Sequence, residues 1–259
     1  MFDSHCHLNF QAFSDTYEAV IKSANNEGID YILIPGTDVE NSEKAIELAE
    51  GHKGIFAAVG MHPTKDFEKT DLNSLVVKLE ELCTSHKVVA IGEIGLDYYR
   101  YKSGSEVQKK YFLSQLELGL RLEKAIIIHN RHAGEDILKL LYKNWVPGMA
   151  GRCVFHCCES DFDLLEFAKD KNIFIGVDGD VTYDTQKQLF IKRVPLSLLL
   201  VETDSPYILP EPVRSQKERK ANEPKNLIYI LKKISEIKNI QTNELIKITK
   251  DNAVKLFAV

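Results

Sequence analysis

The sequence predicts an α/β fold in which eight parallel strands close into a (β/α)8 TIM barrel that spans residues 1–259 as a single domain. Short apolar runs alternate with longer amphipathic segments along the chain, as strands alternate with helices around a parallel sheet. There are eight such runs, and eight is the number of strands that closes this barrel. The length of 259 residues also agrees with the roughly 250 residues of a typical barrel domain.

The expected strands are short and rich in Val, Ile or Phe, which is typical of parallel strands that are covered on both faces. An open doubly wound sheet is the alternative, but that fold often has a glycine-rich phosphate loop after its first strand. Here the first run leads into His7–Phe10, which contains no glycine. In chain order the expected strands are Met1–Phe2 leading into Asp3, Tyr31–Pro35, Ile55–Val59, Val88–Ile91, Ala125–Ile128, Cys153–Phe155, Ile173–Val177 and Leu198–Val201.

The segments between these runs have the spacing of amphipathic helices. Apolar residues recur at helical intervals from Tyr17 to Ala24, and Gly28 supplies a stop for that helix. A second helix contains Ile46 and ends near Gly51. Later helices are expected around Leu113–Leu120, around Leu227–Ile234 and around Leu245–Leu256, the last of which closes the domain.

Composition and charge exclude several classes of protein. A formal net charge of −5 argues against a generally basic protein that wraps nucleic acid, although a local basic patch stays open. No run approaches the roughly 20 apolar residues of a membrane span. Asp3 and His5 interrupt the first apolar run, so no signal peptide is expected. Five cysteines at irregular spacing indicate reduced thiols and a cytoplasmic protein.

Side chains that can bind a metal ion follow six of the eight expected strands. The carboxyl ends of all strands meet at one face of a barrel, where such enzymes have their active sites. Because side chains alternate along a strand, those of Asp3, His5 and His7 point one way, and Cys6 points the other way into the core. His52 and His86 are expected at the surface. The candidates are Asp3, His5, His7, His62, Glu93, His129, His156 and Asp204.

Imidazole and carboxylate ligands suit Zn²⁺, Mn²⁺ or Mg²⁺. Four histidines and two carboxylates are too many for one tetrahedral ion, but they suit two ions that share a bridging carboxylate. Two such ions about 3.5–4 Å apart are the usual arrangement for phosphoester cleavage. The chain has no GxxxxGK[ST] loop for a nucleotide cofactor and no GxSxG nucleophile motif. Cys153, Cys157 and Cys158 do not have the spacing of a cysteine zinc site.

Six segments of the sequence resemble the signature segments of TatD-type metal-dependent deoxyribonucleases. They fall in the family's order and together with a later basic stretch span residues 3–224. The resemblance implies an amidohydrolase-type TIM barrel with two divalent metal ions (Mg²⁺, Mn²⁺ or Zn²⁺). It also implies hydrolysis of DNA from the 3′ end of single strands and a role in DNA repair, with RNA left open as a substrate. The segments are Asp3–His7, Gly60–Pro63, Gly92–Tyr98, Ile128–His129, Phe155–Cys157 and Glu202–Tyr207.

The resemblance also implies a role for each site residue. His5 and His7 would hold the first ion, His129 and His156 the second, and Glu93 would bridge them. Asp204 would bind metal and orient or deprotonate the attacking water, and His62 would approach the substrate phosphate. Catalysis is therefore assigned to Asp204, Glu93 and His62.

The sequence departs from the family's pattern at three places. His132 follows Arg131 where the family usually has an acidic residue, and a surface role is expected for it. The segment Cys158–Ser160 replaces an aromatic residue, a serine and a glycine after Cys157. The stretch Arg214–Pro224 aligns loosely with the family's basic stretch, so either Arg214 or Arg219 is expected to contact phosphate.

Two loops at the expected active face have side chains that suit nucleic acid. Tyr98–Lys102 interleaves aromatic and basic residues, and Tyr98 is predicted to contact substrate. The stretch after Asp204 carries a local charge of +3, from Arg214, Lys217, Arg219, Lys220 and Lys225 against Glu218 and Glu223.

The sequence thus predicts a monomeric, cytoplasmic deoxyribonuclease with a 3′–5′ exonuclease activity and no membrane partner. One alternative is a hydrolase of the same superfamily that acts on a small amide, lactone or phosphoester. Many such enzymes bridge their metals with a carboxylated lysine, whereas this chain has Glu93 at that position. A second alternative is a barrel that binds nucleic acid or a protein partner without catalysis.

Overall fold

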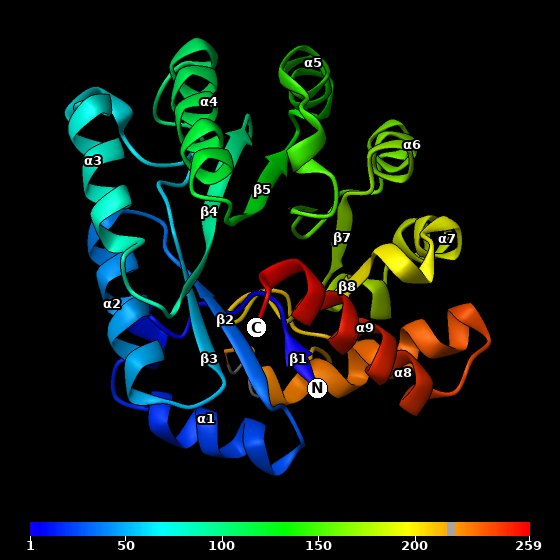
Figure 1. Ribbon diagram of the computed structural model, residues 1–259. Helices are drawn as coiled ribbons and strands as arrows, with labels where there is room; N and C mark the ends of the chain where they lie inside the picture. The colour runs from blue at the N-terminus through cyan, green and yellow to red at the C-terminus, as the bar shows by residue number, and fades with distance from the viewer. Residues whose placement is uncertain (217–220) are drawn as a thin grey trace.

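The computed structural model describes residues 1–216 and 221–259. Within them, eight strands form one sheet in the order β1 to β8, and every strand is parallel to the next along the chain. Helices lie around the outside of this ring (Figure 1). The predicted (β/α)8 TIM barrel is therefore confirmed. The strands are β1 Phe2–Asp3, β2 Tyr31–Pro35, β3 Ile55–Val59, β4 Val88–Asp97, β5 Ala125–Arg131, β6 Cys153–Phe155, β7 Phe174–Val177 and β8 Leu199–Val201.

The helices begin and end where the sequence supplies caps. An aspartate precedes several of them and accepts hydrogen bonds from the backbone N–H groups of the first turn, as Asp38, Asp71, Asp161 and Asp184 do. That the whole of residues 1–259 forms one domain stays a prediction. The helices are α1 Tyr17–Asn26, α2 Val39–Gly51, α3 Leu72–Leu82, α4 Ser105–Arg121, α5 Gly134–Asn144, α6 Phe162–Lys171, α7 Thr185–Arg193, α8 Leu227–Lys238 and α9 Thr242–Phe257.

Backbone hydrogen bonds join the segment that follows β1 to β8 and to the segment that follows β8. The N–H of Ser4 donates to the carbonyl of Val201 (3.2 Å), and the N–H of Asp204 donates to the carbonyl of His5 (3.0 Å). The N–H of His7 then donates to the carbonyl of Ser205 (2.8 Å). These bonds fix the segment after β1 against the segment after β8, so residues almost 200 positions apart share one end of the barrel.

The opposite end of the barrel is closed by apolar side chains. One buried cluster takes at least one residue from every strand, including Phe2, Leu33 and Phe174, and adds Leu256 and Phe257 from the end of α9. The C-terminus lies inside the ring of strands in Figure 1. The prediction that the last helix closes the fold is thus confirmed. The polar end of the barrel is the end at which the carboxyl ends of the strands lie.

Strands β4 and β5 are longer than the sequence predicted. After a register shift, pairing resumes at Ile94 opposite Ile128 and continues to Asp97 opposite Arg131. Gly95 makes this close pairing possible, since it has a φ of 148° and a Cβ there would lie 2.0 Å from the carbonyl oxygen of His129. Glu93 is therefore within β4 rather than after it.

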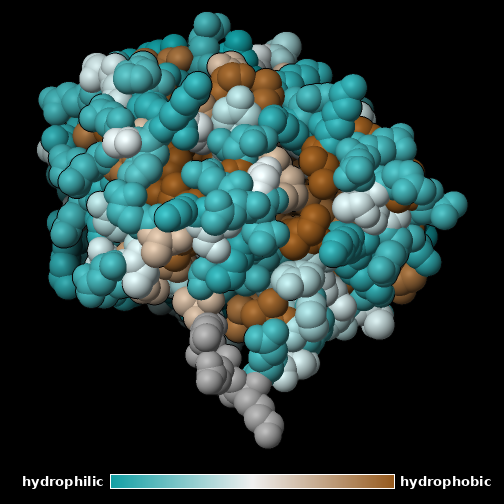
Figure 2. All heavy atoms as spheres, turned by 90° about the horizontal axis from the view of Figure 1, so that it is seen from below, coloured by the Kyte–Doolittle hydropathy of each residue, from teal (hydrophilic) through white to brown (hydrophobic). Residues whose placement is uncertain are grey.

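Figure 2 shows a face on which hydrophobic residues form separate patches among hydrophilic ones. No helix among the described residues is long and apolar enough to cross a membrane.

Candidate metal centre

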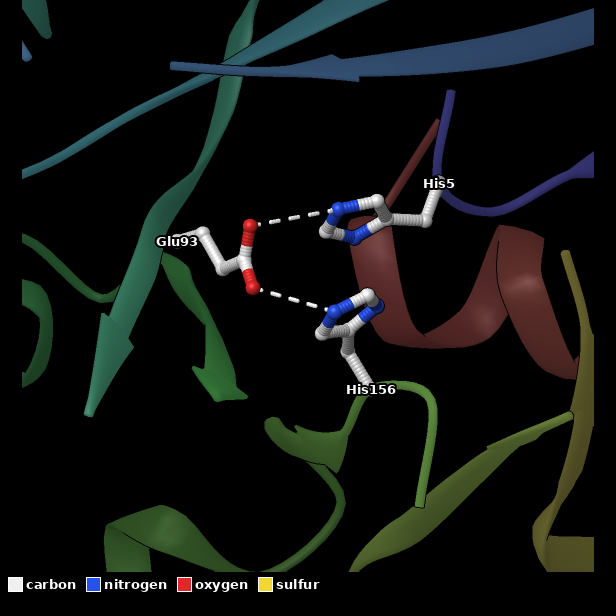
Figure 3. Close-up of side chains that lie close together, drawn as sticks. All are labelled: His5, Glu93 and His156. Carbon is white, nitrogen blue, oxygen red and sulfur yellow. Dashed lines mark ion pairs between the residues drawn. The ribbon is translucent and has the colours of Figure 1, made fainter. Parts of the chain in front are cut away.

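Glu93 is the centre of a buried cluster of histidines at the carboxyl ends of the strands. Figure 3 shows its two carboxylate oxygens directed at His5, which follows β1, and at His156, which follows β6. The carboxylate is almost completely buried, and His62 and His129 also lie within 4 Å of it. Segments that follow β1, β3 and β6 thus converge with β4 and β5 on one carboxylate.

The two oxygens of Glu93 face different pairs of histidines, which we call the first and the second group, although His5 of the first and His156 of the second stack on each other at 3.7 Å. Oε2 lies 3.4 Å from Nε2 of His5 and 3.8 Å from Nε2 of His7. Oε1 lies 2.7 Å from Nδ1 of His129 and 3.0 Å from Nε2 of His156. A carboxylate with one oxygen facing each group of imidazoles has the arrangement that a bridging ligand between two cations needs.

Asp204 completes the first group. Its Oδ1 lies 3.8 Å from Nε2 of His5 and 3.5 Å from Nε2 of His7. The two Nε2 atoms face each other at 3.3 Å, and two neutral imidazoles can share only one proton along that line. Burial lowers the pKa of His5 to about 3, so its ring stays neutral and keeps a lone pair. A divalent cation between these nitrogens and the Asp204 oxygen fits this set of donors.

The second group carries protons that a cation would replace. Burial by itself would lower the pKa of His129, but hydrogen bonds to Asp97 and Glu93 raise it above its usual value. In contrast, burial by itself would raise the pKa of Glu93, but His156 and the hydrogen bond to His129 bring it well below its usual range. Opposite charges therefore hold this cluster together, and metal binding releases such protons because ligands must be deprotonated.

Two carboxylates that the sequence analysis did not assign lie behind the histidines of the second group. Nε2 of His129 lies 3.1 Å from Oδ2 of Asp97, and Nδ1 of His156 lies 3.3 Å from Oε1 of Glu202. A carboxylate behind a histidine fixes the proton on the far nitrogen and leaves the near nitrogen for a metal. Both residues stood in the segments that resemble the TatD-type signature, but their roles depend on contacts between different strands.

His62 has the reverse arrangement of hydrogen bonds. The N–H of Thr64 donates to Nδ1 of His62 (3.1 Å), and the Thr64 hydroxyl lies 2.6 Å from the same atom. Because Nδ1 accepts, the proton of the neutral ring is on Nε2, and burial lowers the pKa of His62 so that the neutral form prevails. Nε2 lies 3.4 Å from Oε1 of Glu93 and is therefore a hydrogen-bond donor that points into the cluster.

Asp3 is directed away from this centre, although its position at the end of β1 suggested a metal ligand. Its carboxylate accepts hydrogen bonds from the N–H (2.9 Å) and the hydroxyl (2.6 Å) of Thr203. It is in none of the groups of potential ligands formed by the described residues. Asp3 instead fixes the turn that carries Asp204. Cys6 is fully buried in the core, as predicted.

Cys157 lies closer to the centre than the spacing of the cysteines suggested. Its thiol, a His156 nitrogen and an Asp204 oxygen lie within 4.8 Å of one another. Burial raises the pKa of the Cys157 thiol well above its usual value, and Asp178 adds to the effect. Since the thiolate is the form that binds metal, this environment does not favour Cys157 as a ligand.

The segment after His156 lacks the expected glycine, and hydrogen bonds hold its backbone in place. The N–H of Cys157 donates to Oε1 of Glu202 (2.6 Å), and the N–H of Cys158 donates to the carbonyl of Gly176 (3.1 Å). The ammonium of Lys187 donates to the carbonyl of Cys158 (2.5 Å). Cys157 itself has a φ of 42°, a left-handed conformation that these bonds maintain.

The family described as "TatD related DNase" has a model that matches residues 2–258. The chain belongs to this family. It is thus a metal-dependent hydrolase that acts on ester bonds, which confirms the resemblance drawn from the six sequence segments.

Several relatives extend over the whole chain. The uncharacterized metal-dependent hydrolase YabD of Bacillus subtilis is 34% identical over 100% of this chain and 99% of its own length. The 3'-5' ssDNA/RNA exonuclease TatD of Shigella flexneri is 29% identical over 100% of this chain and 99% of its own length. The solved structure of the TatD homologue YJJV from Escherichia coli has a TM-score of 0.88 at 28% identity and covers 100% of this chain and 98% of its own.

The residues of this TatD-family chain that were predicted to contact substrate do not gather in one cluster as the candidate ligands do. The hydroxyl of Tyr98 donates to Asp136 (2.7 Å), so this end of the side chain is occupied within the protein. The guanidinium of Arg214 lies over the ring of Tyr183 at 4.2 Å and is half-exposed. Arg219 lies outside the described residues. His132 is exposed, as expected, and its N–H donates to the carboxylate of Glu159 (3.1 Å).

Proposed function

We propose that this chain is a deoxyribonuclease that removes nucleotides from the 3′ end of single-stranded DNA by metal-dependent phosphodiester hydrolysis. The observation that carries the proposal is the division of the Glu93 oxygens between two groups of histidines. One metal ion would be held by His5, His7 and Asp204, and a second by His129 and His156, with Glu93 shared. The exonuclease name of a full-length relative supports the choice of substrate.

Each residue of the cluster has a part in this reaction. The metal ions that these residues would hold would supply a water molecule of lowered pKa and positive charge to offset the charge that develops on the phosphate oxygens. Asp204 orients the attacking water and accepts its proton, since its carboxylate lies at the edge of the cluster with 9% of the residue exposed. The Nε2–H of His62 donates to a non-bridging oxygen of the phosphate, where negative charge increases in the transition state.

The test is cleavage of 5′-labelled single-stranded DNA in the presence of Mg²⁺, Mn²⁺ or Zn²⁺. We expect a ladder that shortens from the 3′ end and is abolished by EDTA, by Glu93→Ala and by Asp204→Asn. Asp184→Asn is the matched control, because this exposed N-cap lies outside the cluster and asparagine caps a helix equally well. Circular dichroism verifies that each variant is folded.

Other outcomes would assign a different function. Full metal-dependent turnover by Glu93→Ala or Asp204→Asn would exclude the proposed roles. Hydrolysis of small amides or lactones without cleavage of DNA would identify a small-molecule hydrolase. DNA binding and tight metal retention without turnover would identify a binding protein. The monomeric state, the cytoplasmic location and the role in DNA repair stay predictions from the sequence.

A further inference from the structure

Exposed aromatic side chains gather at the end of the barrel that carries the metal centre. Of the six aromatic residues that are exposed in the described part of the chain, four lie in loops that follow the carboxyl ends of strands. Tyr99 and Tyr101 follow β4, Tyr183 follows β7, and Tyr207 follows β8. An exposed aromatic ring leaves a large apolar face in water, so four of them around one site indicate a ligand with flat apolar faces.

Tyr207 lies directly beside the candidate ligands. Its ring is 6.3 Å from that of His7 in an edge-to-face arrangement, and Phe10 stacks on His7 at 4.2 Å. The N–H of Tyr207 donates to the carbonyl of Asp204 (2.9 Å), so the residue is fixed relative to the proposed base. About half of Tyr207 is exposed (51%). A flat group could therefore stack on Tyr207 while the atoms attached to it reach Asp204.

Tyr99 lies in the loop that follows β4, the strand that carries Glu93. The guanidinium of Arg131 lies over its ring at 4.3 Å, and His132 contacts it edge-on at 5.3 Å. The N–H groups of Tyr99 (2.8 Å) and Arg100 (2.6 Å) both donate to Oδ1 of Asp97, whose other oxygen faces His129. Asp97 thus joins the loop that presents Tyr99 to the second group of histidines.

The side chains that lie over and beside the ring of Tyr99 are positively charged. Arg100 and Arg131 both lie near Tyr99, and neither forms an ion pair with a carboxylate of the described residues. The chain as a whole has a net charge of −5, so uncommitted arginines beside exposed rings are a local departure from its average. Aromatic faces that stack bases, next to cations that contact phosphates, are the combination by which proteins hold single-stranded nucleic acid.

We propose that Tyr207 and Tyr99 form a stacking platform that holds the unpaired bases of two nucleotides of the substrate strand. Tyr207 stacks the nucleotide at the scissile phosphate, and Tyr99, with Arg131 beneath it and Arg100 beside it, stacks a neighbouring nucleotide and contacts its phosphate. Because bases in a duplex already cover both of their faces, this platform selects single strands. The proposal rests on the proposed function and names the residues that set its substrate class.

The platform is tested by binding of a fluorescein-labelled oligothymidylate to the Asp204→Asn protein, measured by fluorescence anisotropy in Mg²⁺. Base stacking on an aromatic side chain contributes about 1–3 kcal/mol, so adding Tyr207→Ala or Tyr99→Ala should raise Kd by about 5-fold to 150-fold. Phenylalanine at either position should keep Kd within about twofold, because the ring remains. Tyr142→Ala is the control, since Tyr142 is 63% exposed near the end of α5, away from the carboxyl ends of the strands.

An oligonucleotide that lacks a single base identifies which ring holds which nucleotide. Removing the base at the 3′ end should weaken binding to the parent protein but not weaken it further in the Tyr207→Ala variant. The same test one or two nucleotides upstream should pair with Tyr99→Ala. Unchanged Kd in both alanine variants, or equal losses for complete and abasic strands, would overturn the platform.

The failure of the platform and the failure of the proposed function give different results. If the wild-type protein cleaves the strand while the alanine variants bind it as tightly as the parent protein, the platform is wrong and the nuclease assignment stands. If the wild-type protein neither cleaves nor binds the strand, both are wrong. A duplex of the same sequence that binds as tightly as the single strand would exclude stacking as the source of selectivity.

Discussion

At the scale of single residues, the partner of each histidine's second nitrogen decides what that histidine can do. His129 and His156 each have a carboxylate near the ring nitrogen that is farther from Glu93, so the nitrogen nearer Glu93 could bind a metal ion. His62 has the N–H of Thr64 behind it, which makes its inner nitrogen a donor. Residues of one type therefore take two roles in one cluster. From these hydrogen bonds we expect His129 and His156 to bind metal and His62 to contact substrate.

Asp97→Asn should weaken metal binding about 10-fold to 100-fold, because the amide can no longer accept the His129 proton as a carboxylate does. Asparagine still offers an oxygen to the N–H groups of Tyr99 and Arg100, so the loop itself should persist. Competition for Mn²⁺ with a chelating dye measures the affinity. Asp71→Asn, an exposed N-cap of α3, is the control. Equal Mn²⁺ affinity in Asp97→Asn and in the control would contradict this role of Asp97.

His62→Asn should lower kcat for phosphodiester cleavage about 100-fold to 1,000-fold, the usual effect of losing one donor to a developing oxyanion. The number of bound metal ions, measured by atomic emission, should not change, because the inner nitrogen carries a proton. His129→Asn serves as the comparison and should lose bound metal. A loss of metal in His62→Asn equal to that in His129→Asn would show that His62 is a ligand.

At the scale of elements, the helices that pack around the barrel help to position the loops that follow the strands. The segment after β6 carries His156, and the ammonium of Lys187 on α7 holds its backbone through the carbonyl of Cys158. Lys187 is buried and also lies 3.2 Å from Oδ2 of Asp180. Burial would lower the pKa of Lys187, but Asp178 and Asp180 raise it above its usual value. The charge of Lys187 thus connects α7 to the loop of a candidate ligand.

Lys187→Met should reduce the free energy of unfolding by about 3–5 kcal/mol, since it leaves the carboxylates of Asp178 and Asp180 without their buried cation. Urea denaturation measures the change. Lys192→Met on the same helix is the control, because Lys192 is exposed and its replacement should alter stability by about 0.5 kcal/mol or less. Similar unfolding midpoints for the two variants would contradict the structural role of Lys187.

At the scale of the whole molecule, the candidate metal centre joins the segments that follow the first and the last strand of the barrel. His5 and His7 belong to the first segment and Asp204 follows the last strand, so a bound ion would link the two edges where the barrel closes. An ion that binds the folded chain but not the unfolded one stabilises the fold in proportion to the logarithm of its concentration. Metal binding should therefore be visible in stability as well as in catalysis.

Removal of metal with EDTA should lower the unfolding temperature of the wild-type protein relative to a sample with Mn²⁺ at 100 times its Kd. Each ion bound at this excess contributes about 2.7 kcal/mol, or roughly 5–10 °C for a chain of this size. Differential scanning calorimetry measures the difference. Glu93→Ala, which removes the shared carboxylate, should abolish most of the shift. Identical unfolding temperatures with and without metal in the wild-type protein would show that this centre does not bind Mn²⁺.

The number and order of the strands, and most of the residues that meet around Glu93, could be predicted from the sequence alone. This was possible because both patterns are local: apolar runs of strand length recur along the chain, and the end of each run is visible in the sequence. Parallel strands then place their ends together, so His5, Glu93, His129 and His156 could be brought to one site without coordinates.

The orientations of these side chains could not be predicted from the sequence and are known only from the tertiary structure. Asp97 and Glu202 behind the histidines, Asp3 directed at Thr203, and the donor nitrogen of His62 all depend on atoms that belong to different segments of the chain. Asp3 and Thr203 are 200 positions apart, and no local pattern in the sequence encodes that the Asp3 side chain turns toward Thr203 and not toward the cluster. The physical reason is that hydrogen bonds and charges act over a few ångströms in space, whereas the sequence orders residues only along the backbone.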